Sequence, residues 1–154
     1  MPDGRIALDD PCAPDVRALL ERHLAFAHEH SPPDSVHALD LDGLADPAIA
    51  FFSYRADGRL LAVGALRMLD GGHAELKSMH TAEAARGRGI AREMVDFLVG
   101  EARARGAHRV SIETGATEPF APARRLYASA GFVPCAPFGD YVDDGFSTCM
   151  TLSL

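Results

Sequence analysis

The stretch Arg86-Gly87-Arg88-Gly89-Ile90-Ala91 decides the fold of this 154-residue chain. Strand-forming residues precede it, and apolar residues at helical spacing follow it. The first turn of a helix presents N–H groups without internal partners at the positive end of the helix dipole, which suits a phosphate. The two glycines let the backbone approach an anion closely, and Arg92 adds a further positive charge nearby. The stretch therefore predicts a pyrophosphate-binding loop that opens a helix.

Two other phosphate-binding motifs do not fit this stretch. A Walker loop requires Gly-x-x-x-x-Gly-Lys-Ser/Thr, and the chain contains no such string. A dinucleotide-binding fingerprint requires a third small residue where Arg92 stands. It also follows the first strand of a parallel unit and not a meander. The sequence excludes both motifs.

The residues after the loop predict a helix, a strand and a second helix. Apolar residues recur at helical spacing over 90–102, and Gly106 is typical of the position after a helix. Strand-forming residues occupy 110–114, and residues 119–130 favour a helix that ends at Gly131. A strand, a helix and a strand joined in this way form a right-handed crossover with parallel strands.

The residues before the loop predict an antiparallel meander. Strand-forming segments cover 48–54, 60–68 and 73–81, and the turn sequences Asp57-Gly58 and Asp70-Gly71-Gly72 separate them. Short turns of this kind join neighbouring antiparallel strands. The meander would therefore lead directly into the predicted loop.

The two ends of the chain complete the predicted sheet. Residues 5–8 favour a short strand, and Asp10 is the expected N-cap of a helix that ends before Ser31-Pro32-Pro33. The connection over 31–46 is long enough to be a candidate substrate-facing loop. Residues 132–133 and 146–154 favour a final hairpin. The order of elements predicts a mixed α/β fold whose central mixed sheet of about seven strands has helices on both faces.

Length and composition are those of one domain over residues 1–154. Hydrophobic residues make up 47% of the chain, and the formal net charge of −7 argues against nucleic acid as a partner. No apolar run approaches the length of about 20 residues that spans a bilayer. The N-terminus lacks the pattern of a secretory signal. We therefore expect a cytoplasmic protein that binds neither nucleic acid nor membrane.

The cysteines and histidines follow no metal-binding pattern. Cys12, Cys135 and Cys149 are odd in number and have neither metal nor redox spacing, which suits a reducing cytoplasm. The histidines of the first 40 residues match no established ligand spacing. They are His23, His28, His30 and His37. We therefore expect no metal cofactor.

Three motifs give the chain a resemblance to the GNAT superfamily of acyl-CoA-dependent N-acetyltransferases. Arg86, Gly89 and Ala91 match the family signature Arg/Gln-x-x-Gly-x-Gly/Ala, and residues 74–81 resemble the fourth strand of the family. Residues 123–127 followed by Gly131-Phe132 are similar to its Ala-x-x-Leu-Tyr and Gly-Phe element. The runs 120–124 and 137–141 resemble a small, mostly uncharacterised bacterial subgroup. The resemblance implies a single N-acetyltransferase domain with a GNAT-like fold, in which a splayed pair of parallel strands holds acetyl-CoA.

The resemblance also implies which residues hold acetyl-CoA. Backbone groups of the fourth strand would pair with pantetheine, the loop would hold the pyrophosphate, and donors near a bulge at 78–79 would face the thioester oxygen. The implied donor-binding residues are Met79, His80, Thr81, Arg86, Gly87, Arg88, Gly89, Ile90 and Ala91. Phe120 stands where many relatives carry asparagine, and it would pack against pantetheine instead of bonding to it.

Tyr127 matches the family tyrosine that is usually assigned to protonate the departing thiolate. A tyrosine has an ordinary pKa of about 10 and a cysteine-like thiol about 8.5, so this proton would move uphill by about 2 kcal/mol. Hydrogen bonding to the sulfur is therefore the alternative role for Tyr127. An amine is mostly protonated at neutral pH and needs a proton acceptor. Glu75 is the first candidate for this base, Glu113 the second and His80 the third.

These residues predict transfer of an acetyl group from acetyl-CoA to a primary amine of a small molecule by direct attack. The candidate acceptor-binding residues are His37, Phe51, Glu113 and Tyr141. Acidic residues near the cleft favour a cationic acceptor. The main alternative is a non-catalytic acyl-CoA sensor or a module that docks a partner, and a longer acyl donor is a third option. Because many relatives dimerise, the resemblance leaves a homodimer open.

Overall fold

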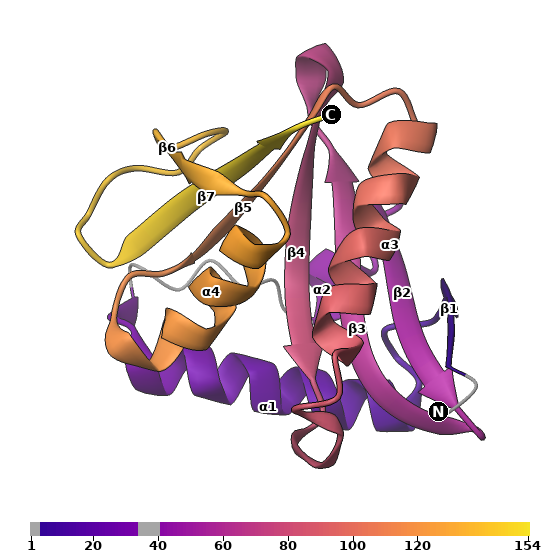
Figure 1. Ribbon diagram of the computed structural model, residues 1–154. Coiled ribbons are helices and arrows are strands. Elements are labelled where there is room, and N and C mark those ends of the chain that lie inside the picture. The colour runs from indigo at the N-terminus through magenta and orange to yellow at the C-terminus, as the bar shows by residue number, and fades with distance from the viewer. Residues whose placement is uncertain (1–3, 34–40) are drawn as a thin grey trace.

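The computed structural model describes residues 4–33 and 41–154, which form a seven-stranded sheet with helices on both faces (Figure 1). The strands lie in the order β1-β2-β3-β4-β5-β7-β6. They are β1 (Arg5–Leu8), β2 (Ile49–Ala56), β3 (Arg59–Met68), β4 (His73–Thr81), β5 (Arg109–Gly115), β6 (Val133–Cys135) and β7 (Ser147–Ser153). Of the strand pairs described, β4 and β5 alone run parallel. The predicted mixed α/β sheet is confirmed.

The helices lie on opposite faces of this sheet. In Figure 1, α3 (Ile90–Ala104) and α4 (Ala121–Ser129) lie in front of the sheet, and α1 (Pro14–His30) crosses behind it. The short α2 (Leu41–Leu44) precedes β2. Three 3₁₀ turns complete the described elements: η2 (Asp70–Gly72), η3 (Glu83–Ala85) and η4 (Glu118–Phe120).

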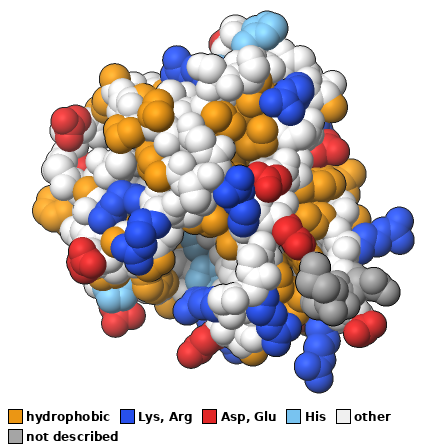
Figure 2. Space-filling model, in the orientation of Figure 1, with side chains coloured by type: hydrophobic (Ala, Val, Ile, Leu, Met, Phe, Trp, Pro, Cys, Tyr) orange, Lys and Arg blue, Asp and Glu red, His pale blue; other side chains and the backbone are white. Residues whose placement is uncertain are grey.

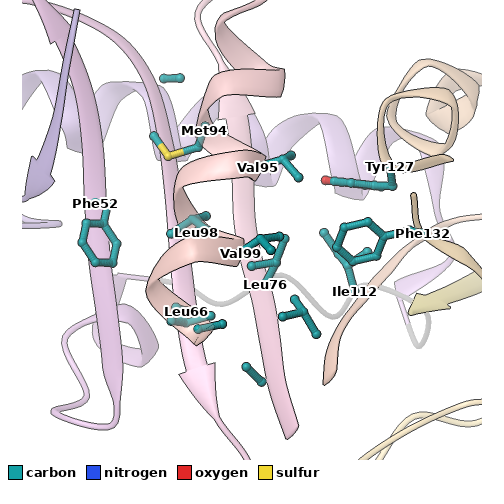
Figure 3. Close-up of a cluster of buried hydrophobic side chains, with 14 of the residues drawn as sticks. Phe52, Leu66, Leu76, Met94, Val95, Leu98, Val99, Ile112, Tyr127 and Phe132 are labelled. Atoms are coloured by element: carbon teal, nitrogen blue, oxygen red, sulfur yellow. The ribbon is translucent and has the colours of Figure 1, made fainter. Parts of the chain in front are cut away.

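Two neighbouring phenylalanines of β2 show why both faces are covered. Successive side chains of a strand point to opposite faces. Phe52 belongs to the larger core, in which Leu98 of α3 is fully buried (Figure 3). Phe51 belongs to the smaller core with Leu19 and Leu20 of α1. Each face of the sheet therefore has its own helix layer.

The boundaries of two predicted helices shift. Asp10 was the expected N-cap of the first helix, but Ala13 occupies that position and α1 begins at Pro14. Proline suits the first helical turn because its missing N–H has no partner there. Asp10 instead accepts a hydrogen bond from the Cys12 N–H at 2.8 Å, which closes the turn before the helix. The helix expected over 119–130 divides into η4 and α4.

The parallel strands β4 and β5 separate where a cleft begins. Pairing between β4 and β5 ends at Leu76 and Ile112, although both strands continue beyond these residues. The register of β3 against β4 shifts between Val63 and Ala65, and Ser78 has a positive φ of 55°. This is the bulge expected at 78–79. It turns the end of β4 away from β5 and opens the sheet.

A glycine lies opposite this bulge. Gly64 of β3 faces the extra residue, and a Cβ there would lie 2.8 Å from Sδ of Met79 and 2.9 Å from Cδ1 of Leu98. Both atoms are outer ends of flexible side chains, so a larger residue at 64 would require these side chains to move. The glycine thus leaves room for Met79 of the bulge and Leu98 of α3 to pack against β3.

Candidate active site

The space between the separated strands is a cleft of about 490 Å³. Its walls come from α1, β4, β5, η4 and α4. Figure 2 shows this face of the molecule, with basic side chains around a hollow and histidine at its floor. The lining residues that matter below are His23, Phe26, Lys77, Ser78, Met79, His80, Thr81, Arg86, Ala91, Glu113, Phe120, Tyr127 and Tyr141.

The predicted loop forms the N-terminal end of α3. Gly87 and Gly89 both have a φ of 78°, and Gly89 is the N-cap of the helix. A Cβ at either glycine would meet no protein atom within 4 Å. Positive φ favours glycine at both positions, and the space beside the backbone is open to a ligand. This geometry is that of an anion site at a helix N-terminus.

The arginines near the loop have different partners. Arg86 Nε donates to the Thr81 carbonyl at 3.4 Å, and Arg88 Nη2 donates to the Ala84 carbonyl at 3.3 Å. Both are long contacts that a phosphate would readily replace. Arg92, in contrast, bonds to Asp96 at 3.1 Å and to the Ser129 carbonyl at 3.0 Å. Arg92 therefore ties α3 to the C-terminal end of α4.

The other end of the cleft contains a buried group of charged and polar side chains on β4. Glu75 and Lys77 are 4% and 9% exposed, and Lys77 Nζ lies 3.1 Å from Glu75 Oε2. Tyr141 donates a hydrogen bond to the same Glu75 oxygen at 2.5 Å and accepts one from Lys77 at 3.1 Å. Burial, together with the charge of Glu75, raises the pKa of Tyr141. Lys77 and Tyr141 line the cleft, and Glu75 lies behind them.

Glu113 lies across the gap on β5. It is the first residue after the last one that pairs with β4, so its side chain projects where the strands have separated. Burial raises the pKa of Glu113 to about 7. The charge of Lys77 and the nearby Ser147 hydroxyl lower this pKa, and the charges of Glu75 and Asp144 raise it. Its Oε2 atom is buried without a hydrogen-bond partner among the described residues. Of the two candidate glutamates, Glu113 is the one that lines the cleft.

Tyr127 of α4 is buried and also lines the cleft. Its ring packs against Phe132 with centroids 5.9 Å apart, and Figure 3 shows its hydroxyl pointing away from Phe132 on the side of Val95. Burial, followed by the charge of Glu113, raises the pKa of Tyr127. The hydroxyl therefore stays protonated and can donate a hydrogen bond into the cleft.

His80 forms a pair with His23 across the β4–α1 contact. Their Nδ1 atoms lie 3.3 Å apart, and their rings meet edge to face with centroids 5.1 Å apart. Burial lowers the pKa of each ring to about 4. In His80 the neighbouring His23, Arg86 and Arg22 add to this effect. Both rings are neutral near neutral pH, and His80 is a weaker base than an ordinary histidine.

The remaining predicted acceptor residues are not all at the cleft. Phe51 is buried in the core beneath α1 and is not among the residues that line the cleft. His37 lies outside the described residues. Phe120 lines the cleft, where its ring packs against Gly115 and lies 5.2 Å from that of Phe26. The sequence did not predict that Phe26 lines the cleft, because an aromatic residue on one face of a helix usually belongs to the hydrophobic core.

The side chains of Lys77 and Ser78 also line the cleft, although the sequence did not predict them as part of the site. Lys77 is the single lysine of the chain and stands two residues from Glu75, so the strand period already placed both on one face. The two-residue spacing could have indicated that Lys77 lies beside Glu75. The position of Ser78 at the bulge was predicted, but its buried hydroxyl was not.

The described part of the chain contains neither a metal-site cluster nor a membrane-spanning helix. No cluster of three or more His, Cys, Asp or Glu side chains in residues 4–33 and 41–154 has the arrangement of a metal site. None of the helices described is both long and apolar enough to cross a membrane.

Comparison with known proteins agrees with this fold. The sequence model described as "Acetyltransferase (GNAT) family" matches residues 13–132. The chain is 42% identical to "Uncharacterized N-acetyltransferase YsnE" of Bacillus subtilis (strain 168), over 97% of this chain and 99% of that protein. It is 40% identical to "Uncharacterized N-acetyltransferase YedL" of Escherichia coli (strain K12), over 97% and 94%. It is 35% identical to "IAA acetyltransferase" of Azospirillum brasilense, over 97% of each protein.

Solved structures share the fold at lower sequence identity. A putative acyl-CoA N-acyltransferase from Klebsiella pneumoniae superposes with a TM-score of 0.83 at 24% identity, over 99% of this chain and 98% of that one. A Bacillus subtilis acetyltransferase in complex with CoA superposes with a TM-score of 0.74 at 18% identity, over 99% of both chains. The chain belongs to the acetyltransferase (GNAT) family and is an N-acetyltransferase.

Proposed function

We propose that the protein transfers the acetyl group of acetyl-CoA to a primary amine of a small molecule by direct attack. The observation that carries this proposal is the continuity of the cleft. One cleft runs from Arg86 and Ala91, at the N-terminal end of α3, to Lys77, Glu113 and Tyr141. It therefore joins an anion site to a group of ionisable side chains suited to a reacting amine.

The donor half of the proposal rests on backbone geometry. Beyond Leu76, none of the described strands lies beside the edge of β4 that faced β5, while Val63 of β3 still pairs with His80 on the other edge. Backbone groups of Met79, His80 and Thr81 are thus available to pair with the amides of pantetheine, as in the addition of a strand. The loop would hold the pyrophosphate. The similar Bacillus subtilis acetyltransferase was solved with CoA.

The chemistry requires a neutral amine and a stabilised oxyanion. The amine nitrogen attacks the thioester carbon, a C–N bond forms, and the C–S bond then breaks to release the thiolate. Backbone N–H groups at the Ser78–Met79 bulge are placed to donate to the oxyanion, and one such donor is worth about 3 kcal/mol. Tyr127 would donate a hydrogen bond to the departing sulfur. Direct attack needs no acetyl-thioester on the protein, and none of the described residues that line the cleft is a cysteine.

The charges at the acceptor end support a cationic acceptor, such as a polyamine or a basic amino acid. The charge of Glu75 acts on Glu113 across the cleft, and Lys77 is a positive group that acts on both carboxyl groups. A second positive charge, supplied by the acceptor, would balance this excess of acid. The proposed setting is the cytoplasm, where the free thiols of Cys12, Cys135 and Cys149 stay reduced. A homodimer remains a prediction that gel filtration can test.

The test is an acceptor screen with purified protein and acetyl-CoA. It includes polyamines, basic, neutral and anionic amino acids, and IAA, because one relative is named for that compound. We expect CoA release matched by an N-acetylated product in mass spectra, fastest with cationic amines. Binding of acetyl-CoA without product from any amine would contradict the proposal and favour a sensor. A preference for anionic amino acids would contradict the cationic acceptor.

A further inference from the structure

Three buried side-chain oxygens have no hydrogen-bond partner among the described residues: Ser78 Oγ, Glu113 Oε2 and Ser147 Oγ. Buried polar atoms are nearly always paired, because each unpaired one destabilises the fold. Ser78 and Glu113 line the cleft from opposite sides, on β4 and β5. A carboxylate oxygen that faces a cleft in this way is completed when a donor enters the cleft.

Glu75, the first candidate for the base, differs from Glu113 in this respect. Its Oε2 atom already accepts hydrogen bonds from Lys77 and Tyr141, and Lys77 is its ion-pair partner. If Glu75 took up the proton of an amine, it would lose its charge and leave Lys77 buried without a counter-ion, which is costly. Glu75 also lies outside the lining of the cleft.

We propose that Glu113, and not Glu75, binds the ammonium group of the acceptor and takes up the proton that the amine must lose. This inference rests on the proposed function. Glu75 then serves as the counter-ion of Lys77. Because Lys77 forms its ion pair with Glu75, it acts on Glu113 through its charge and not through a direct ion pair, and the Oε2 atom of Glu113 stays available for a cation from the cleft.

The proton balance of this step is simple. The acceptor enters as an ammonium ion and gives one proton to the Glu113 carboxylate, which leaves the nitrogen lone pair free to attack. After attack, the second proton of the nitrogen passes to the departing thiolate as the C–S electron pair moves to sulfur. Glu113 returns its proton to solvent. The products are the amide, the CoA thiol and one proton in solution.

The surroundings of Glu113 suit this role. Burial, Lys77 and Glu75 of β4, Asp144 before β7 and Ser147 of β7 together bring its pKa to about 7. In addition to burial, the charge of Glu113 in turn raises the pKa of Tyr127, Tyr141 and Cys149. A base works best when its pKa lies near the working pH, since it is then both available and strong enough. An arriving ammonium ion favours the ionised form.

The experiment compares Glu113→Gln and Glu75→Gln in the full-length protein, with Glu118→Gln as the matched control. Glu118 is exposed, lies five residues along the chain from Glu113 and does not line the cleft. kcat and kcat/KM are measured across neutral pH for an alkylamine that the wild type acetylates and that stays protonated throughout. Acetyl-CoA affinity is measured in parallel.

We expect Glu113→Gln to lower kcat by about 100-fold to 1,000-fold. It also abolishes the rise of kcat/KM whose midpoint lies near pH 7 in the wild type. Acetyl-CoA affinity stays unchanged. A hydrazide acceptor is already unprotonated at neutral pH and does not need the base. With a hydrazide, the difference in kcat between Glu113→Gln and the wild type should therefore be smaller. Glu75→Gln keeps the rise but moves it to lower pH, because the charge of Glu75 raises the pKa of Glu113. Glu118→Gln behaves as the wild type.

Two results would overturn the inference while the proposed function stands. One is a Glu113→Gln variant that keeps kcat and the rise near pH 7. The other is a Glu75→Gln variant that loses the rise. A wild type that acetylates no amine would overturn the inference and the proposed function together.

Discussion

The two ends of the cleft are built in different ways. The proposed donor end is one continuous stretch, 86–91, whose backbone conformation and N–H groups would do the binding. The acceptor end brings together side chains from β4, β5, α4 and the connection that carries Tyr141. At the donor end few side chains are buried, whereas at the acceptor end Glu75 and Lys77 are almost completely buried. Substitutions at the donor end should therefore change the free energy of unfolding little, whereas substitutions at the acceptor end should lower it.

The largest expected effect comes from breaking the buried ion pair at the acceptor end. Lys77→Met leaves the carboxylate of Glu75 buried without its cation, which should lower the free energy of unfolding by about 3–5 kcal/mol. Chemical denaturation measures it. The double variant Glu75→Gln/Lys77→Met is the control, since it removes both charges and should recover most of the loss. If the single variant were as stable as the wild type, the pair would not support the acceptor end.

The next effect is a pH dependence of stability. Glu113 has a pKa of about 7 in the folded protein, above the ordinary value of 4.5. Ionisation of this buried carboxyl group lowers the free energy of unfolding. The loss is absent below pH 4.5 and grows as the pH rises to about 7. Above that pH, Glu113→Gln should unfold with a free energy higher than the wild type by about 3 kcal/mol. Thermal melts of the wild type and Glu113→Gln at acidic and alkaline pH measure this effect. A stability difference between the two proteins that is the same at both pH values would contradict the prediction.

A donor-end substitution should change binding and leave folding nearly intact. Gly89→Ala places a side chain at a φ of 78°, which costs about 1–2 kcal/mol, and directs a methyl group at the open anion site. We expect acetyl-CoA affinity to fall about 100-fold, as when a charge-assisted hydrogen bond is lost. Calorimetric titration measures it. The control is Gly100→Ala, in the exposed middle of α3 with open space at its Cβ, which should bind normally.

The smallest effect should come from the loop arginines. Arg86→Ala and Arg88→Ala each remove one flexible charge that contacts a carbonyl at more than 3 Å. Each should raise the acetyl-CoA KM by about tenfold, and the effect should shrink at high salt. Arg103→Ala, an exposed change in the last turn of α3, is the control. An unchanged KM in both loop variants would argue against pyrophosphate binding at this loop.

Most of the fold was predictable because it depends on local patterns. The strand expected at 73–81 has those bounds, and the strands expected at 5–8, 48–54 and 60–68 lie within a few residues of the observed ones. Turn sequences and helical spacing act within a few residues of chain, so a single sequence contains them. The N-cap at Asp10 was wrong because Asp9, Asp10 and Pro14 compete for the same turn, and proline determines where the helix begins.

The difference between the two candidate bases was not predictable in the same way. Glu75 and Glu113 both stand on strands that border the cleft, and their sequence context does not distinguish them. The difference lies in their neighbours: Tyr141 comes from a segment 66 residues away in sequence from Glu75, and it completes the group that occupies this carboxylate. A pKa depends on burial and on such distant charges.

The sequence by itself determined the donor end of this protein, because an anion site made of backbone N–H groups needs only glycines, a helix start and nearby arginines in one continuous stretch. The tertiary structure alone decided the acceptor end. There, the separation of β4 from β5 after Leu76 exposes Glu113 to the cleft, and the return of the chain to Tyr141 closes the hydrogen bonds around Glu75. Charges interact through space and not along the chain, so which carboxylate is free depends on the fold.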